Sequence, residues 1–321
     1  MTAKQQYKQI GKILLVFTIL ASVLQILFSI LYKAVFKVTV DYNSILGWIV
    51  TFVPIYLIAF PISLVMFKKL PVKKAEPQKM KFSRFLVYFI ECIAIMYIGN
   101  IIGSFLSLAL SDGEAINPLT EITSSNSFSQ VLVVSIIAPI IEEIVFRKKI
   151  IDHTIMYGEK ASIIYSAFTF ALFHMNLYQF FYAFGLGLMF GYIYVKTRNI
   201  KYPIIIHVII NFFGGVVAPF ILSQIDMTAI ENINLLSESE IISMLIPLLI
   251  LIVYSIVLII LVIIGVILLI KNWKKISFNQ TELDIPQEEI VKTSFLNTYY
   301  VLFAVFCLGA IIFTLLINST Y

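Results

Sequence analysis

The chain has 321 residues, of which 60% are hydrophobic and 13% are charged, and its mean hydropathy is +0.97. These values exclude an ordinary soluble domain and place the chain among polytopic membrane proteins. The net charge of +5 does not indicate a nucleic-acid partner, because the lysines gather in short loops beside apolar runs, where they set membrane topology. We therefore expect an all-α helix bundle whose main partner is the lipid bilayer.

Nine apolar runs are read as membrane-crossing helices, judged against the roughly 20 residues that a helix needs to span a bilayer. They cover approximately residues 12–32, 44–67, 84–110, 129–147, 160–175, 178–196, 202–222, 241–270 and 296–317. The run 160–175 is short and polar at its end. We expect it to form a tight hairpin with 178–196 that is buried within the bundle, since polar backbone at that depth needs protein or a water-filled cavity around it.

The charges of the loops predict the orientation of the bundle. The loop 68–84 carries seven lysines and arginines against the single acid Glu76, whereas the loops 111–128 and 223–240 contain neither lysine nor arginine. Basic loops stay in the cytoplasm. The N-terminus is therefore predicted to lie inside and the C-terminus outside a plasma membrane, and the richness in isoleucine, lysine and asparagine favours a bacterial source. The polar segment 276–295 is expected to be a solvated cytoplasmic connection.

Two consecutive glutamates stand at the end of the fourth run. An ionised carboxylate in lipid costs at least about 2.5–3.5 kcal/mol, so Glu142 and Glu143 need a reason beyond packing. In a helix, Glu143 and Arg147 share one face at i,i+4 and can pair, while Glu142 points to a neighbouring face. Either the three residues form a structural cluster of charged side chains at the membrane edge, or Glu142 is free to act in catalysis.

Further polar pairs follow at the same helical spacing, Phe170 with His174 and His207 with Asn211. A single histidine in a membrane helix is a hydrogen-bond partner for a neighbouring helix about as often as it is a functional residue. Together with the glutamates, these residues supply a carboxylate base, an imidazole and donors for an oxyanion, which are the parts of a water-activating site. Glu91, inside the third run, could pair with Arg84 at the cytoplasmic end or line the same cavity, and a structural partner is the favoured interpretation.

These residues resemble the three motifs of the CPBP intramembrane proteases, the CAAX-processing and bacteriocin-processing (Abi) family. The matching positions are Glu142-Glu143-x-x-x-Arg147, Phe170-x-x-x-His174 and His207-x-x-x-Asn211. The likeness covers roughly residues 130–215. We accordingly divide the chain into N-terminal transmembrane helices (1–128), a protease core with the catalytic helices (129–222) and C-terminal transmembrane helices (223–321).

The resemblance implies an endopeptidase that cleaves a membrane-associated or hydrophobic peptide, in CAAX-type processing, peptide maturation or bacteriocin self-immunity. Carried over by position, Glu142 would activate water with help from His174. His207 and Asn211 would then stabilise the tetrahedral oxyanion. The residues that would support the site are Glu143, Arg147 and Phe170.

Family members are commonly labelled metalloproteases, and Glu142, His174 and His207 could in principle bind zinc. The sequence has no His-Glu-x-x-His signature, and a buried glutamate–histidine pair suffices for water activation, so we expect no metal or other cofactor.

Two other classes of function remain open. One is a catalytically idle scaffold or immunity protein that binds a partner membrane protein, although a scaffold has no need of ionisable groups in lipid. The other is a transporter, whose paired interrupted helices in two related halves are not found in the sequence.

Overall fold

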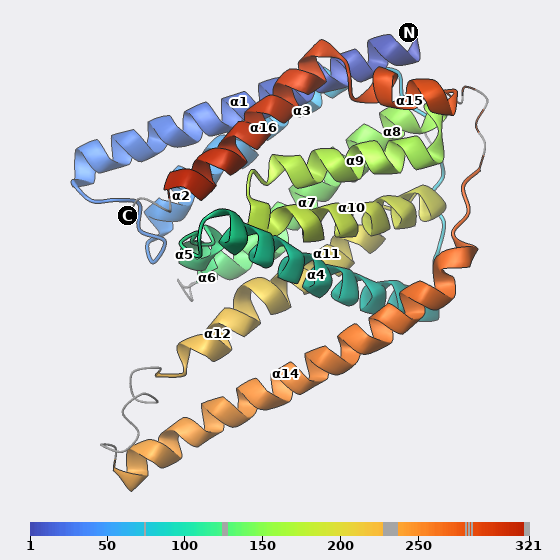
Figure 1. Cartoon of the computed structure of the whole chain (residues 1–321). Coiled ribbons are helices and arrows are strands. Elements are labelled where there is room, and N and C mark those ends of the chain that lie inside the picture. The colour runs from blue at the N-terminus through green and yellow to red at the C-terminus, as the bar shows by residue number, and fades with distance from the viewer. Residues whose placement is uncertain are drawn as a thin grey trace.

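The computed structural model describes residues 1–73, 75–123, 128–226, 237–279, 281, 283 and 285–317. Every regular element in these residues is a helix, which confirms the predicted all-α class (Figure 1). In chain order the elements are α1 (Ala3–Phe36), α2 (Ile45–Val53), η1 (Pro54–Ala59), α3 (Phe60–Phe67), α4 (Phe82–Leu110), α5 (Leu119–Thr123), α6 (Phe128–Gln130), η2 (Val131–Ile137), α7 (Ala138–Glu142), η3 (Glu143–Ile151), α8 (Asp152–Thr154), η4 (Ile155–Tyr157), α9 (Glu159–Phe173), α10 (Leu177–Thr197), α11 (Lys201–Phe212), η5 (Phe213–Val217), α12 (Ala218–Ser223), α14 (Glu238–Asn272), η7 (Trp273–Lys275), α15 (Gln287–Ser294) and α16 (Thr298–Ile317).

Seven helices among the described residues are long and apolar enough to cross a membrane, so the chain is a multi-pass membrane protein. They are Ala3–Phe36, Ile45–Phe67, Phe82–Leu110, Phe128–Tyr157, Lys201–Ser223, Ile242–Lys275 and Thr298–Leu316. The predicted count of nine is not confirmed, because α9 and α10 are helical but are not among the seven. Helix α9 has only 15 residues, and tyrosines, glycines and Gln179 dilute the apolar run of α10.

The predicted hairpin of these two helices is confirmed. Helix α9 ends at Phe173, α10 begins at Leu177, and Met175 between them adopts a left-handed conformation with φ +49°. Most side chains of α9 are buried. The two helices pack so closely that a Cβ at Gly187 would lie 2.9 Å from the Cα of Ala167. Small residues thus bring the backbones together, as they do in other membrane helix pairs.

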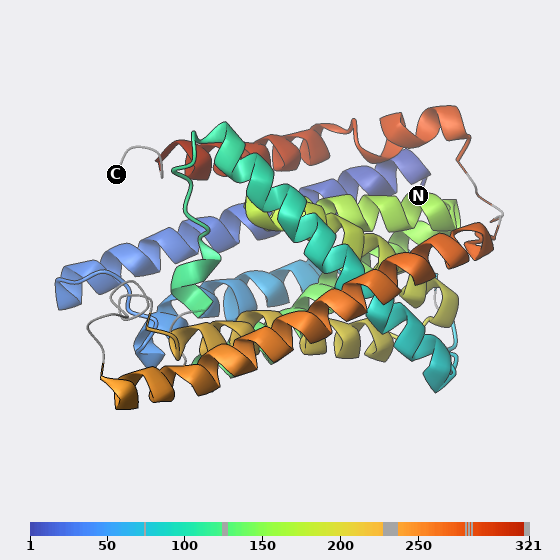
Figure 2. The ribbon, with the colours of Figure 1, turned by 60° about the horizontal axis from the view of Figure 1, so that its bottom comes forward.

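The hairpin lies at the centre of the bundle. Helix α10 packs between α9 and α4, and α14 lies along the outer side of α4 (Figures 1 and 2). On the other side, α1 packs against α16 and against the span made by α2, η1 and α3. Helix α1 begins at one end of the bundle, and α16 ends toward the opposite end (Figure 1).

Polar contacts tie the loops to the end of the bundle that carries the N-terminus. The backbone amide of Lys73 donates to the carbonyl of Asp152 (3.0 Å), and that of Gln78 donates to the carbonyl of Thr197 (2.7 Å). Arg198 pairs with the Asp152 carboxylate at 2.9 Å. The basic loop that follows α3 is therefore fixed across the ends of the central helices.

The described part of the segment 276–295 is mostly exposed to solvent, as expected, but polar contacts also anchor it on the core. The backbone amide and the side-chain amide of Asn279 donate to the two carboxylate oxygens of Glu159, at 2.9 and 3.1 Å. Lys196 pairs with the same carboxylate at 2.8 Å. The hydroxyl of Thr281 donates to the carbonyl of Met156 at 2.8 Å, and the segment ends with the helix α15. Glu282 and Asp284 lie outside the described residues, as do 124–127 and 227–236 of the two loops predicted to be external.

Candidate active site

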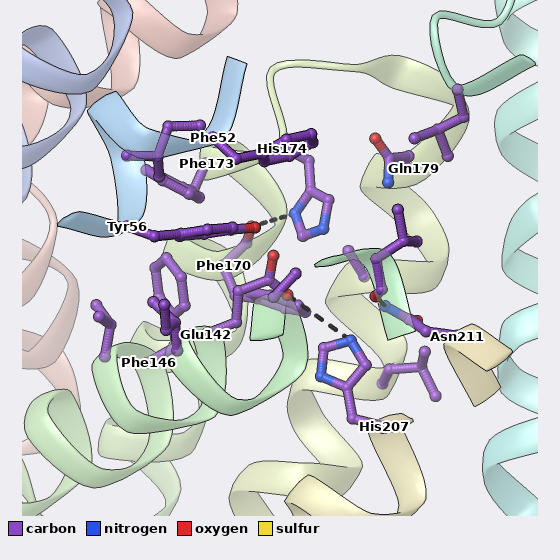
Figure 3. Close-up of a pocket in the computed structure, with 18 of the residues that line it drawn as sticks. Phe52, Tyr56, Glu142, Phe146, Phe170, Phe173, His174, Gln179, His207 and Asn211 are labelled. Atoms are coloured by element: carbon purple, nitrogen blue, oxygen red, sulfur yellow. Dashed lines mark hydrogen bonds and ion pairs between the residues drawn. The ribbon is translucent and has the colours of Figure 1, made fainter. Parts of the chain in front are cut away.

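A cavity of about 220 Å³ opens among the central helices. Side chains from α2, η1, α7, α9, α10 and α11 line it, and most of them are aromatic or aliphatic (Figure 3). The polar side chains that line it are Tyr56, Glu142, His174, Gln179, Tyr182, His207 and Asn211. The structure thus brings the four predicted catalytic residues, which come from three parts of the sequence, to one cavity.

The two glutamates are linked through His207. Its Nδ1 lies 3.0 Å from Glu143 Oε1, and its Nε2 lies 3.7 Å from Glu142 Oε2. The other oxygen of Glu143, Oε2, lies 3.1 Å from Arg147 Nε, as the i,i+4 spacing predicts. The groups therefore form a row in the order Arg147, Glu143, His207 and Glu142. Only Glu142 of the two carboxylates lines the cavity.

Arg147 and Glu143 are both fully buried, with 0% of each side chain exposed. The guanidinium lies over the ring of Phe170, 4.1 Å from its centroid, and 5.4 Å from that of Phe190. Among the described residues, its terminal nitrogens have no hydrogen-bond partner. Aromatic faces and one carboxylate thus balance this charge, and Phe170 covers it on the side of the cavity.

His174 is the C-cap residue that directly follows α9. Its Nδ1 lies 2.8 Å from the carbonyl oxygen of Phe170. A carbonyl only accepts hydrogen bonds, so Nδ1 carries a proton and the other nitrogen, Nε2, remains for another partner. The ring of Phe170 lies 4.6 Å from the imidazole of His174 and 6.0 Å from that of His207, each edge to face. Figure 3 shows the carboxylate of Glu142 between the two histidines.

Asn211 reaches the cavity one helical turn beyond His207. Its Nδ2 donates a hydrogen bond to the carbonyl oxygen of Val134 in η2, at 3.1 Å. This bond fixes the amide beside the helix that carries Glu142. One hydrogen of the amide remains for another acceptor.

Some residues of the cavity are not evident from the sequence motifs. Phe52 and Tyr56 come from the second membrane span, and Gln179 and Tyr182 come from the start of α10. Figure 3 shows Tyr56 reaching toward His174. These side chains lie far from Glu142 in sequence or off the motif spacing, so no local pattern marks them.

Glu91 does not line this cavity. Its carboxylate accepts a hydrogen bond from Asn272 Nδ2 at 2.8 Å, which joins α4 to the end of α14. Gly265 lies about two turns before Asn272 on α14. The α4 backbone approaches it closely, since a Cβ added there would lie 2.5 Å from the carbonyl oxygen of Ile90. The structural reading of Glu91 is thus confirmed, with Asn272 rather than Arg84 as its partner.

The arrangement does not fit the zinc site that the metalloprotease label implies. Among the residues that the structure describes, no three histidine, cysteine, aspartate or glutamate side chains are grouped to hold a metal ion. His207 faces a carboxylate with each ring nitrogen, and His174 faces a carbonyl with one. A catalytic zinc site usually needs three protein ligands directed at one point.

Comparison with known proteins shows which family the chain resembles. Residues 124–213 match the family model described as type II CAAX prenyl endopeptidase Rce1-like. The membrane-embedded CAAX protease MroQ of Staphylococcus aureus (strain USA300) is 30% identical over 161 residues. The predicted resemblance to the CPBP family is confirmed. The MroQ match covers 45% of this chain and 61% of that protein. No solved structure matches the chain.

The CPBP-matched segment contains the three motif pairs and the whole central hairpin. Tyr56 and Phe52 lie outside it. The cavity is therefore built partly from CPBP motif residues and partly from a helix that the family match does not cover.

Proposed function

We propose that this chain is an intramembrane endopeptidase that hydrolyses a peptide bond in its central cavity. The observation that carries the proposal is the convergence of Glu142, His174, His207 and Asn211 on one mainly apolar cavity. Buried ionisable groups in a membrane helix cost free energy, and they occur mainly where they serve a function. The similarity to the Rce1-like family model and to the protease MroQ supports the same reaction class.

In the proposed mechanism, Glu142 is the general base. It takes a proton from a water molecule, and the oxygen of that water adds to the carbonyl carbon of the scissile peptide bond. His174 directs Nε2 toward the water and helps to orient it. His207, held by Glu143, and Asn211, anchored on Val134, bind the oxyanion that forms. Protonated Glu142 then returns its proton to the leaving amine.

The lining of the cavity supports an uncharged, hydrophobic substrate segment. No lysine or arginine is among the residues that line it, and its walls include Phe52, Phe146 and Phe173. The guanidinium of Arg147 is covered by Phe170 and paired with Glu143. A membrane-associated peptide with apolar side chains beside the scissile bond matches these walls.

The test is cleavage of a library of hydrophobic, fluorescence-quenched peptides by purified protein in proteoliposomes. We expect the wild-type protein to cleave a subset of the peptides and Glu142→Gln to cleave none, because the substitution keeps the shape and removes the base. Absence of cleavage by the wild-type protein, together with capture of an intact membrane protein, would favour the scaffold or immunity role instead.

We further propose that the reaction needs no tightly bound metal, since His207 and His174 already have other partners. Chelator-washed protein should hold much less than one equivalent of zinc in elemental analysis and should keep its activity. One retained equivalent, with activity lost on its removal and restored on its return, would overturn this mechanism and make the histidines ligands.

A further inference from the structure

A directed chain of side-chain hydrogen bonds runs along the first turns of α10. The backbone N–H of Tyr178 donates to Asn176 Oδ1 at 3.0 Å, which fixes the orientation of that amide. Asn176 Nδ2 must then donate to Gln179 Oε1 (3.1 Å). Gln179 Nε2 in turn donates to the hydroxyl oxygen of Tyr182 (2.9 Å). A backbone N–H can only donate, so the direction of the whole chain is set at its first bond.

The consequence falls on the proton of Tyr182. Its hydroxyl oxygen already accepts from Gln179, so its O–H must be directed elsewhere. Tyr182 and Gln179 both line the cavity, as does Glu142. The hydroxyl therefore offers a hydrogen-bond donor to the space that holds the proposed general base.

The backbone of Tyr182 is held in place by α4. A Cβ added at Gly99 would lie 2.5 Å from Tyr182 Cα and 2.6 Å from its backbone nitrogen, so the two helices touch at this residue. Donors that are fixed before the reaction stabilise a developing charge best, because they need not reorganise during it. Tyr182 meets this condition through its backbone contact and through the bond from Gln179.

The other donors of the cavity are partly engaged. Asn211 gives one hydrogen to Val134, and His207 lies between two carboxylates. We propose that Tyr182 is a further catalytic residue of this site, whose hydroxyl donates to the carbonyl oxygen of the scissile peptide bond. The inference rests on the proposed peptidase function and adds to it a residue that the family motifs do not contain.

The step balances without any further reactant. As the water oxygen bonds to the carbonyl carbon, Glu142 takes the water proton and the π pair of the carbonyl moves to its oxygen. Tyr182 keeps its own proton and donates the hydrogen bond to that oxyanion. When the carbonyl re-forms, the C–N bond breaks and the amine leaves with the proton from Glu142.

The experiment compares Tyr182→Phe with the wild-type protein on a terminally blocked fluorogenic peptide that the wild-type protein cleaves. We expect kcat to fall by about 10²–10³-fold, the loss typical of one oxyanion donor. KM should change little, because the donor acts mainly in the transition state. A phosphinate analogue of the same peptide, which mimics the tetrahedral state, should bind Tyr182→Phe more weakly, while the intact peptide should bind Glu142→Gln and Glu142→Gln/Tyr182→Phe equally well.

Tyr178→Phe is the matched control, because its hydroxyl donates to the carbonyl of Ala115 and does not line the cavity. It should keep the wild-type kcat. Gln179→Leu, which frees the Tyr182 hydroxyl to turn, should give a smaller loss than Tyr182→Phe. An unchanged kcat in Tyr182→Phe, or a loss in Tyr56→Phe alone, would overturn the assignment to Tyr182. Failure of the wild-type protein to cleave any peptide would instead count against the proposed function.

Discussion

Glu143 holds two partners at once, one on each carboxylate oxygen. Arg147 pairs with Oε2 and His207 with Oε1, at 3.1 and 3.0 Å. The first partner lies on the same helix and the second on α11, 64 residues away. One buried carboxylate therefore both neutralises the guanidinium and orients the imidazole that faces Glu142. Because Glu143 has these two roles, its function differs from that of the adjacent Glu142 more than their positions on the helix alone would indicate.

The separation predicts different outcomes for the two amide substitutions. Glu143→Gln leaves the fully buried Arg147 without its counter-charge, which should lower the free energy of unfolding by about 3–5 kcal/mol. Glu142→Gln removes a group that lines the cavity, so it should change that free energy by about 1 kcal/mol or less while abolishing cleavage. Unfolding in detergent micelles, measured beside peptide cleavage, checks both. Normal stability in both variants would contradict this division of roles.

At the scale of the helices, prolines widen the turns around the cavity. The π-helical segments η1, η2 and η5 each end one residue before an X-Pro step, at Phe60-Pro61, Ala138-Pro139 and Ala218-Pro219. In each, the first amide beyond the segment bonds five residues back. Proline has no N–H and its ring displaces the carbonyl four residues earlier, so the preceding turn opens.

One freed carbonyl has an identifiable partner. Gly215, four residues before Pro219, accepts a hydrogen bond from the side chain of Gln130 at the start of η2. The η1 segment carries Tyr56, and the η2 segment carries Val134, the anchor of Asn211. The widened turns thus lie at the cavity, where π-helical turns are frequently found in functional sites.

Close packing of α9 and α10 makes a second prediction at this scale. A Cβ at Gly187 would lie 2.9 Å from Ala167 Cα, a backbone atom that cannot move aside alone. Gly187→Ala should therefore lower the free energy of unfolding by about 1–3 kcal/mol through overpacking. It should also reduce cleavage, because His174 directly follows α9 and would shift with it.

Gly309→Ala on α16 is the control, since nothing lies within 4 Å of the added Cβ. We expect it to be neutral or to stabilise the helix by about 0.5–1 kcal/mol. Equal destabilisation by the two substitutions, measured by unfolding in micelles, would show that close backbone approach at Gly187 is not the cause.

At the scale of the whole molecule, the basic loops predict which end of the bundle faces the cytoplasm. The segment η7, which contains Lys274, follows α14 at the end of the bundle that carries the N-terminus, and the loop between α4 and α5, which contains Glu114, lies toward the opposite end (Figure 1). Both side chains are exposed. The native cysteines, Cys92 and Cys307, are fully buried and should give little background. In intact cells, a membrane-impermeant maleimide should therefore label Glu114→Cys and not Lys274→Cys. Labelling of Lys274→Cys alone would reverse the predicted topology.

The order of residues in the sequence is enough to predict the features that lie within one helix. Hydropathy and loop charge gave a multi-pass helical protein, and the i,i+4 spacing paired Glu143 with Arg147 and brought Phe170 against His174. The short run 160–175, which is polar at its end, lies next to the run 178–196, and this pattern predicted the central hairpin. These features depend on helical periodicity and on the cost of polar groups in lipid, which act locally and can be read from residue order.

Apart from this hairpin, which helices pack against one another is seen in the tertiary structure and could not be predicted from the sequence. The bond between His207 and Glu143, the place of Tyr56 and Tyr182 in the cavity, and the pairing of Glu91 with Asn272 join residues from different helices. Their distances depend on crossing angles and on where small residues such as Gly99 allow close approach, and one sequence does not specify these. Periodicity orients a side chain on its own helix, but packing chooses its neighbour.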